Sequence, residues 1–340
     1  MPQKSKSTAS HSETMLFENN SLLPMLYGEN DATLKKLEKK LNVGMVSRGN
    51  MLAITGEQEA VNQARAVLEN LYGALAAGED VNKAEIDAAI RMETDPKKPS
   101  KNKTTTVPSL TIKTLRKEVK AYTPKQAEYI KALHDHDLVF ALGPAGTGKT
   151  YIAVAMAVKK FINHEVDRII LSRPAVEAGE KLGFLPGDLK DKIDPYLRPL
   201  YDALFEMMSP EKVMRHIENG EIEVAPLAFM RGRTLSNAYI IMDEAQNSTA
   251  TQMKMFLTRL GEGSQMAVTG DLSQMDLPRD VKSGLADATR KLDGVEGVEI
   301  TRFADGDVVR HDLAAKIVHA YEEWDKVKRI RAEEARSKGD

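Results

Sequence analysis

Leu138-Val-Phe-Ala-Leu-Gly-Pro-Ala-Gly-Thr-Gly-Lys-Thr150 decides the fold of this chain. The apolar run from Leu138 to Leu142 has the length of a buried strand, and the next eight residues match the pattern G-x-x-x-x-G-K-[ST] at every fixed position. The segment from Tyr151 to Phe161 then has the apolar composition of a buried helix. The order strand, glycine loop, helix predicts a P-loop at the centre of an α/β domain.

The chemistry of phosphate binding explains why these residue types recur at this spacing. Glycines let successive backbone N–H groups converge on a phosphate at a helix N-terminus. Lys149 then reaches the β and γ phosphates, and the hydroxyl of Thr150 ligates Mg²⁺. We therefore predict that nucleotide is bound by the following residues: Gly143, Pro144, Ala145, Gly146, Thr147, Gly148, Lys149, Thr150 and Tyr151.

Length and composition limit the classes of protein that this chain can represent. Its 340 residues, 42% of them hydrophobic, suffice for one large α/β domain and one small domain. A formal charge of −2 argues against a polyanion-binding surface over the whole molecule, and the absence of cysteine excludes disulfides and thiolate metal sites. The polar N-terminus and the lack of any long apolar run lead us to expect a soluble cytoplasmic protein without a membrane partner.

The N-terminal part has the pattern of a small α+β domain. We expect residues 1–13 to form a disordered tail and residues 14–92 to fold, with strands near 43–46 and 51–55 and a helix near 61–72. This domain resembles a KH-type RNA-binding module, in which a G-x-x-G loop between helices clamps backbone nucleotides. The corresponding loop here is Gly28-Glu29-Asn30-Asp31, whose carboxylates repel phosphate. RNA clamping and a docking or assembly role therefore both remain open.

Residues 93–121 have the composition of a mobile linker. Basic side chains outnumber acidic ones in this segment, and Pro96, Pro99 and Pro108 interrupt it. It can act as a strap that attracts phosphate or as a solvated tether.

The P-loop domain is expected to span residues 122–325, with residues 326–340 as the end of a charged helix. Gln126 opens a short helix ahead of the P-loop strand, where it either reads the adenine edge or is a surface residue. The apolar run from Ala238 to Met242 delivers Asp243 and Glu244 at the carboxyl edge of a parallel sheet, where ligands bind. There Asp243 would hold Mg²⁺, and Glu244 would orient or deprotonate the attacking water.

Two further side chains are suited to act on the γ-phosphate. Gln274 follows the strand expected at Gln265 to Thr269 and would serve as a sensor, although it can equally be a hydrogen-bonding loop residue. Arg310 lies near the end of the domain and can stabilise charge on the transferred phosphoryl group as an arginine finger.

Taken together, these motifs resemble those of the PhoH-like ATPases. The resemblance runs from about Glu18 to about Trp324 and is carried by these segments: Gly143 to Thr150, Ser172 to Asp188, Asp243 to Gln246, Gly270 to Gln274, and Val309 to His311. It implies a RecA-like, additional-strand P-loop fold, a parallel sheet with helices on both faces, and ATP and Mg²⁺ as ligands.

The family resemblance also implies roles for single residues and partners. It assigns metal binding to Thr150 and Asp243 and catalysis to Lys149, Glu244, Gln274 and Arg310. Bacterial members with a KH-like unit are associated with RNA metabolism, and some with the endoribonuclease YbeY.

Three functional hypotheses follow from the sequence. The first is a Mg²⁺-dependent ATP hydrolase coupled to RNA binding or remodelling, in the manner of a helicase. The second is a nucleotide-dependent scaffold that recruits an endoribonuclease without itself moving RNA. A small-molecule kinase is disfavoured, because the paired Asp243 and Glu244 suit water as the acceptor. Since helicases of this type use two motor domains and this chain has one P-loop, we also expect a ring-like homo-oligomer, with a hexamer as the specific prediction.

Overall fold

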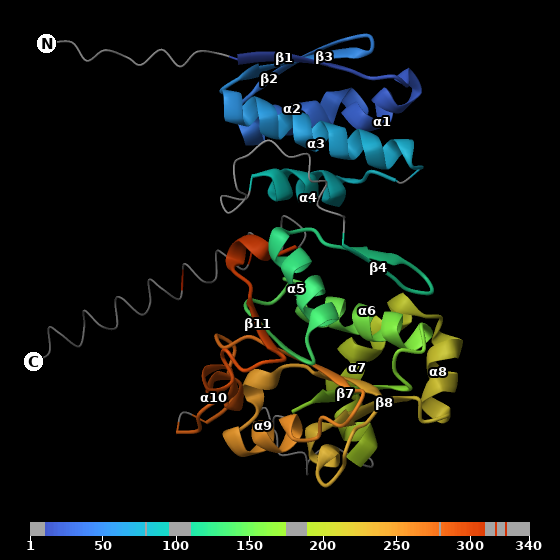
Figure 1. Cartoon of the computed structure of the whole chain (residues 1–340), viewed down its shortest axis with the longest axis vertical. Coiled ribbons are helices and arrows are strands. Elements are labelled where there is room, and N and C mark those ends of the chain that lie inside the picture. The colour runs from blue at the N-terminus through green and yellow to red at the C-terminus, as the bar shows by residue number, and fades with distance from the viewer. Residues whose placement is uncertain are drawn as a thin grey trace, which may run out of the picture. The chain divides into compact units, whose positions relative to one another are not determined.

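The computed structural model describes residues 11–78, 80–94, 110–174, 189–278, 280–309, 317 and 324. The chain divides into two compact units, one formed by Met1–Ser109 with Ala121–Ala127 and the other by Leu110–Lys120 with Glu128–Asp340. Both contain helices and strands, and their elements are labelled in Figure 1.

The N-terminal unit is a three-stranded antiparallel sheet with helices packed against it, in the strand order β1-β3-β2. Its elements are β1 (His11–Leu16), α1 (Leu23–Tyr27), α2 (Ala32–Leu41), β2 (Gly44–Arg48), β3 (Met51–Gly56), α3 (Gln58–Ala76) and α4 (Lys83–Glu93). Alternate residues of β3, Leu52 and Ile54, are fully buried, and they join Leu37 and Leu68 of the helices in one core. The two strands and the long helix expected in this unit are thereby confirmed.

The prediction that residues 1–13 form a disordered tail is wrong for its last three residues. His11–Leu16 pairs antiparallel with β3 along its whole length, so residues 11–13 belong to the sheet. Glu13 forms an ion pair with Arg65 of α3, and Met15 is buried in the core. The polar alternation of His11 to Thr14 concealed this strand, because one of its faces is exposed. Residues 1–10 lie outside the described part of the chain.

The second unit is built on a six-stranded sheet whose order is β11-β6-β10-β9-β7-β8. Every neighbouring pair in it is parallel. Its strands are β6 (Leu138–Leu142), β7 (Arg168–Arg173), β8 (Ile222–Pro226), β9 (Ala238–Met242), β10 (Gln265–Gly270) and β11 (Val298–Arg302). The strand β11 lies at one edge of the sheet. The strand β10 lies between the P-loop strand β6 and the carboxylate strand β9, as an additional-strand fold requires.

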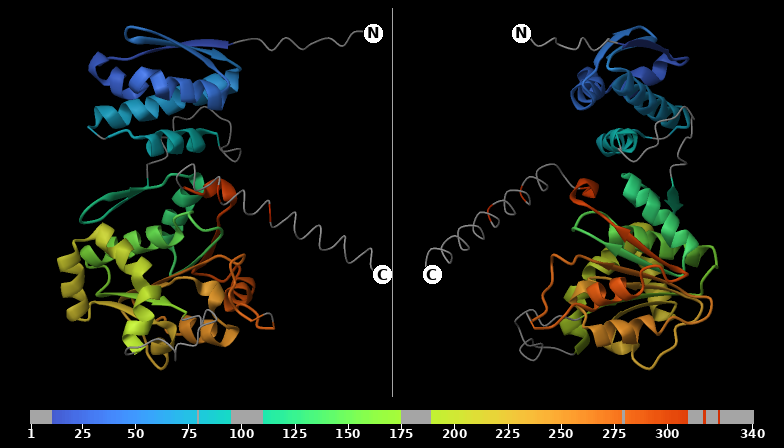
Figure 2. Two further views of the ribbon diagram at one scale, coloured as in Figure 1. Left: turned by 180° about the vertical axis from the view of Figure 1, so that it is seen from behind. Right: turned by 60° about the vertical axis from the view of Figure 1, so that its left-hand side comes forward.

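Helices cover both faces of this sheet, as Figure 2 shows. They are α5 (Pro124–Asp135), α6 (Lys149–Ile162), α7 (Leu189–Met207), α8 (Pro210–Glu218), α9 (Ala250–Leu257) and α10 (Gly284–Lys291). One face forms a core of Phe140, Ile240 and Val268 with Phe256 of α9 and Leu285 of α10. The helix α6 contacts β7, β9 and β10. These layers confirm the expected α/β architecture.

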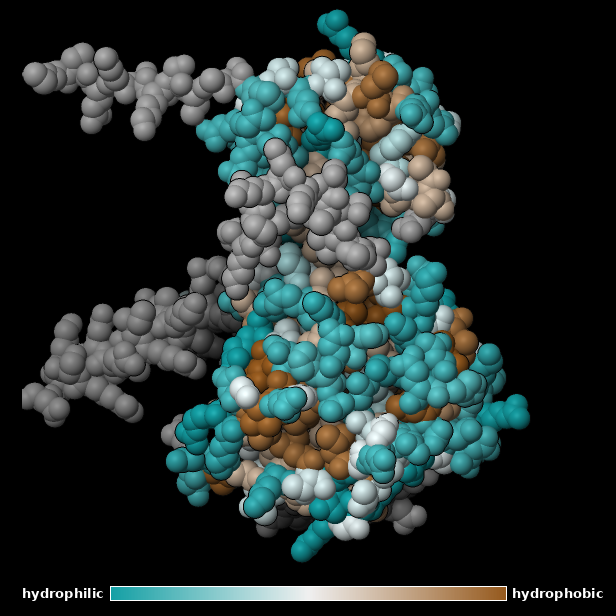
Figure 3. Space-filling view, in the orientation of Figure 1, coloured by the Kyte–Doolittle hydropathy of each residue, from teal (hydrophilic) through white to brown (hydrophobic). Residues whose placement is uncertain are grey.

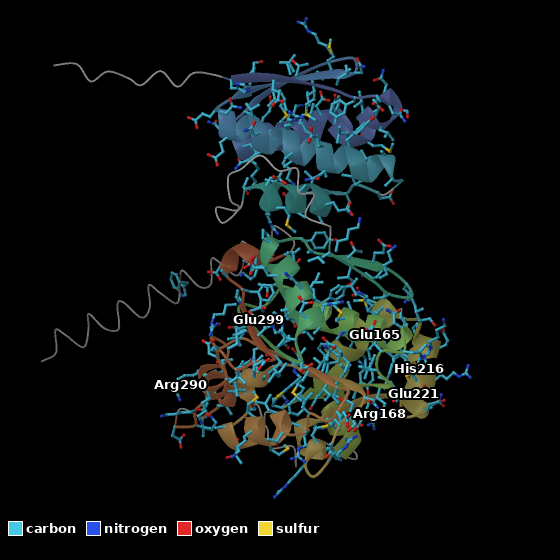
Figure 4. All side chains as sticks on the ribbon, in the orientation of Figure 1. Glu165, Arg168, His216, Glu221, Arg290 and Glu299 are labelled. Carbon is cyan, nitrogen blue, oxygen red and sulfur yellow. The ribbon has the colours of Figure 1, made fainter. Side chains whose placement is uncertain are left out.

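The helix α8 is fastened to its neighbours through His216. The Nδ1 atom of His216 lies 2.7 Å from a carboxylate oxygen of Glu221, and Figure 4 labels this pair. The imidazole also meets the ring of Phe161, at the end of α6, edge to face at 5.0 Å. These contacts hold α8 beside the C-terminus of α6.

The expected linker is wrong at its C-terminal end. Thr111–Lys113 (β4) and Glu118–Lys120 (β5) form an antiparallel hairpin in the second unit, with Ile112 fully buried. Its turn docks on α7 through Arg116, whose guanidinium donates to the carbonyl of Phe205 at 2.6 Å. Lys117 pairs with Glu206 at 2.6 Å. Two of the basic residues that suggested a solvated tether, Arg116 and Lys117, thus have partners at the end of α7, while residues 95–109 lie outside the described part.

The helices of the described part were compared with the length and apolarity that a membrane span needs. None of the helices there is both long and apolar enough to cross a bilayer. The space-filling view in Figure 3 shows hydrophobic residues exposed among more numerous hydrophilic ones on the face that it displays.

Candidate functional site

The P-loop connects the end of β6 to the start of α6 at the carboxyl edge of the sheet. The sheet register pairs Leu142 with Gly270, and Met242 with Ser172, so the residues that follow these strands meet at one edge. This is the edge at which ligands bind in open parallel sheets. Because α6 begins at Lys149, the loop also presents a helix N-terminus, which favours anions.

The conformation of the loop depends on glycine where the chain passes close to other backbone. Gly143 has φ +140°, and a Cβ added there would lie 2.5 Å from the carbonyl oxygen of Phe303. The carbonyl of Gly146, with φ +83°, accepts a 2.9 Å hydrogen bond from the backbone of Val309. The segment that follows β11 therefore packs against the P-loop, through Phe303 beside Gly143 and Val309 bonded to Gly146.

The lysine of the motif is buried in its own loop. Lys149 is 8% exposed, and its ammonium donates to the carbonyl oxygens of Gly143 at 2.6 Å and Pro144 at 2.8 Å. The hydroxyl of Thr147 also donates to the Pro144 carbonyl, at 3.0 Å. To bind a phosphate, the ammonium of Lys149 would have to leave these neutral carbonyl acceptors, and the negative charge of the phosphate favours that exchange. Ala145 and Gly148 are half-buried members of the same loop.

Asp243 and two threonine hydroxyls meet beside the P-loop. Thr150 donates to Oδ1 of Asp243 at 2.6 Å, and Thr269 of β10 donates to the same oxygen at 2.7 Å. Mg²⁺ prefers oxygen ligands and is often held through only one or two carboxylates, with phosphate oxygens and water completing its shell. Thr150 and Asp243 fit such an ion, and no group of three or more metal-binding side chains occurs among the described residues.

Glu244 lies next to this cluster in an unusual backbone conformation. Its φ of +51° places it in the left-handed region, which is uncommon for a residue with a side chain and is often associated with functional sites. Arg173, at the end of β7, approaches one of its carboxylate oxygens at 3.1 Å. Gln246 donates to the other oxygen at 2.5 Å. Two neighbours therefore determine where the Glu244 carboxylate points.

Gln246 also joins this carboxylate to the loop after β10. It is fully buried, its amide nitrogen donates to the carbonyl of Gln274 at 3.2 Å, and its oxygen accepts from the backbone N–H of Asp271 at 3.0 Å. The side chain of Gln274 donates to Asp271 at 2.6 Å. The expected phosphate sensor is thus linked to the expected water-activating residue through Gln246.

Sequence reasoning quoted Arg173, Gln246 and Asp271 only as motif members and gave no role to Thr269. The hydrogen-bond partners of these residues come from other strands, so single-strand patterns could not reveal them. The sequence did contain one indication that these residues belong to the site. Each of them lies at or just after the end of a strand in the parallel sheet.

Tyr151 faces a small polar cluster. Its hydroxyl donates to Glu206 of α7 at 3.0 Å, and the ammonium of Lys117 lies 5.1 Å from the centre of its ring. Partial burial raises the pKa of Tyr151, so its phenol remains neutral. The hydrogen bond from Lys117 lowers the pKa of Glu206. This cluster connects the β4–β5 hairpin to the first turn of the P-loop helix.

For two of the expected site residues, the assigned role stays a prediction. Gln126 is 3% exposed and belongs to the segment grouped with the N-terminal unit, where its amide oxygen accepts from the backbone of Tyr122 at 2.6 Å. Arg310 lies outside the described residues, directly after Val309.

Comparison with known proteins identifies the family of this chain. A family model described as PhoH-like protein matches residues 118–322. The chain belongs to the PhoH-like protein family. A PhoH-like protein of Bacillus subtilis (strain 168) is 48% identical to it over 302 residues, covering 87% of this chain and 93% of that relative.

Other relatives match this PhoH-like chain to different extents. A PhoH-like protein of Mycobacterium tuberculosis (strain H37Rv) is 47% identical, covering 88% of this chain and 85% of its own length. The "Protein PhoH" of Escherichia coli (strain K12) is 50% identical over 58% of this chain and 56% of its own length. Among solved structures, the Pif1 helicase from Candida albicans matches at 12% identity with a TM-score of 0.29, covering 54% of this chain and 39% of that one. The PhoH-like chain is a nucleotide-binding protein of the P-loop ATPase type.

Proposed function

We propose that this PhoH-like protein is a Mg²⁺-dependent ATP hydrolase coupled to RNA binding or remodelling. The observation that carries the hydrolase proposal is the cluster of Thr150, Asp243 and Thr269 at the P-loop, with Glu244 held beside it by Gln246. A P-loop lysine, an acidic metal ligand and a neighbouring carboxylate are the parts that hydrolysis of a phosphoanhydride requires.

Each part has a distinct task in the proposed reaction. The loop N–H groups and Lys149 bind the β and γ phosphates, and Mg²⁺ held at Thr150 and Asp243 would neutralise part of their charge. Glu244 orients a water and accepts its proton as the water oxygen bonds to the γ-phosphorus. The bond from that phosphorus to the bridging oxygen breaks, and ADP leaves. Gln274 senses the γ-phosphate, and Arg310 stabilises the transferred phosphoryl group in this subunit or in a neighbour of a homo-oligomeric, hexameric ring.

The RNA proposal is supported by the element order of the N-terminal unit. Its sequence β1-α1-α2-β2-β3-α3 places the Gly28 to Asp31 loop between two helices, as in the KH-type modules that it resembles. The acidic composition of that loop favours a second candidate function. In it, the protein is a nucleotide-dependent scaffold whose N-terminal unit recruits a protein such as the endoribonuclease YbeY.

Steady-state ATP hydrolysis tests these proposals. Phosphate release should be measured with and without single-stranded and structured RNA, over protein concentrations that span assembly. Lys149→Ala should abolish nucleotide binding or turnover, whereas Glu244→Gln should retain nucleotide binding and lose turnover. Stimulation by RNA supports the coupled hydrolase, and rates that ignore RNA but respond to a nuclease partner support the scaffold. Normal turnover in Glu244→Gln would show that the catalytic assignment is wrong.

A further inference from the structure

Thr269 carries a hydroxyl into the middle of the parallel sheet. It belongs to β10, the strand between β6 and β9, and it is fully buried. The two residues before it, Ala267 and Val268, are apolar and equally buried. A valine of nearly the same shape would fill this position without removing a polar group from water, which is costly unless that group is hydrogen-bonded. The partner of this hydroxyl therefore indicates what the residue does.

That partner is the carboxylate of Asp243. The register pairs Val268 of β10 with Met242 of β9. Thr269 and Asp243 are the residues that follow them, so they are neighbours on adjacent strands. Thr269 donates to Oδ1 of Asp243 at 2.7 Å, and Thr150 donates to the same oxygen at 2.6 Å. One carboxylate oxygen is thus held from two elements, the sheet and the first turn of α6.

The second carboxylate oxygen of Asp243 is left open. Asp243 is 6% exposed, and its Oδ2 atom accepts no hydrogen bond from the residues that the structure describes. Four side-chain polar atoms in the described part are sealed from solvent without a hydrogen-bond partner, and Oδ2 is not one of them. Oδ2 therefore remains accessible. An accessible oxygen of a mostly buried carboxylate is suited to a cation, and Mg²⁺ prefers such oxygen ligands.

We propose that Thr269 is a positioning residue for the metal ligand Asp243. Its hydroxyl fixes Oδ1 from the sheet and leaves Oδ2 for the ion. Thr150 is a less independent support, because its own hydroxyl oxygen is expected to ligate Mg²⁺. Side chains that orient a metal ligand typically contribute about 10–100-fold to metal affinity. The inference rests on the proposed Mg²⁺ site, and it gives a role to a residue outside the P-loop motif.

Binding of a fluorescent, non-hydrolysable ATP analogue to the full-length protein tests the inference. The dissociation constant is measured in excess EDTA and again in excess Mg²⁺, and the ratio of the two values is the gain in affinity due to the metal. Thr269→Val keeps the shape of the side chain, so it should bind the analogue like wild type in EDTA. Its gain in Mg²⁺ should fall about tenfold, because Asp243 loses its support from the sheet. Thr269→Ser keeps the hydroxyl and should retain the gain.

Thr301→Val is the matched control. Thr301 of β11 pairs with Ala141 of β6, and Thr269 pairs with the same residue from the other side. Thr301 is 5% exposed, and it is not one of the two threonines that donate to Asp243 in the described part of the chain. The gain in Mg²⁺ should therefore stay at the wild-type value in this variant. A general effect of removing a buried hydroxyl from the sheet would change both valine variants alike.

Three results would overturn the inference. They are a wild-type gain in Thr269→Val, an equal weakening of its binding in EDTA and in Mg²⁺, or a Thr269→Ser variant that behaves like Thr269→Val. The second result would show that Thr269 only supports the fold. Failure of the proposed metal site looks different, because wild-type protein would then bind the analogue no better in Mg²⁺ than in EDTA, and the inference would fall with it. The assay requires no hydrolysis, so its outcome is independent of turnover.

Discussion

The substitution Gln246→Met tests whether the buried glutamine holds Glu244 in its working position. Methionine keeps the length and approximate volume of the side chain but removes its three hydrogen bonds, to Glu244, Gln274 and Asp271. The backbone N–H of Asp271 is then left unpaired in a buried place, at a cost of about 1–3 kcal/mol. The carbonyl of Gln274 can turn to water, because that residue is exposed. For a unit of roughly 200 residues, each kcal/mol lowers Tm by about 2–4 °C.

The effect on turnover should exceed the effect on nucleotide binding. Glu244 keeps Arg173 as a neighbour but loses the 2.5 Å hydrogen bond that directs its other oxygen. Loss of such a supporting contact typically costs about 10–100-fold in activity. We expect kcat for ATP hydrolysis to fall in that range, with KM nearly unchanged, because the hydrogen bonds of Gln246 described above join Glu244, Gln274 and Asp271, none of which belongs to the P-loop.

Phosphate-release kinetics and thermal unfolding should be measured on the same preparations. The matched control is Gln265→Met, at the amino end of β10, where a half-buried glutamine donates to the carbonyl of His136 at 3.2 Å. The control should retain turnover. Wild-type kcat in Gln246→Met, together with the expected loss of stability, would refute the view that Gln246 positions Glu244.

Two other changes probe the packing around the P-loop. Gly143→Ala places a Cβ 2.5 Å from the Phe303 carbonyl at a φ of +140°, so it should destabilise the second unit by about 2–5 kcal/mol. Its control is Gly220→Ala, with φ +73° and open space around it, which should cost only about 1–2 kcal/mol. Equal losses of stability in thermal unfolding would contradict the close approach at Gly143. Lys117→Met removes the cation whose hydrogen bond lowers the pKa of Glu206 below its ordinary value. A carboxylate whose pKa is lowered on folding contributes stability that is fully present above its unfolded pKa. The stability difference between wild type and Lys117→Met should therefore be present at neutral pH and disappear as pH falls through the folded-state pKa of Glu206. A difference in stability that grows in acid would contradict the pairing.

Local patterns predicted the strands and helices that are strongly apolar. The strand at Leu138–Leu142 has the predicted bounds, because all five of its side chains are buried and the glycine loop ends it sharply. The strand β1 and the hairpin β4–β5 were missed, because most of their residues are polar or charged. The strand β1 pairs with the distant β3, and the hairpin docks on α7. Ile112 and Val119 were the only local sign of the hairpin, and basic neighbours obscured them.

The candidate site also has a part that the sequence predicted and a part that it did not. Lys149, Thr150, Asp243 and Glu244 could be named from the sequence, since phosphate and metal chemistry restrict the residue types at motif positions. The contacts that arrange them could not. Asp243 receives hydrogen bonds from threonines 93 and 26 residues away, and only the sheet order places those hydroxyls together.

The P-loop and the acidic residues after β9 are thus encoded in short stretches of sequence, because backbone geometry and charge act over a few residues. The support of Glu244 by Arg173 and Gln246 is a consequence of tertiary structure. Hydrogen bonds and burial depend on which distant segments the fold brings within about 3 Å of one another, and a linear pattern does not contain that information.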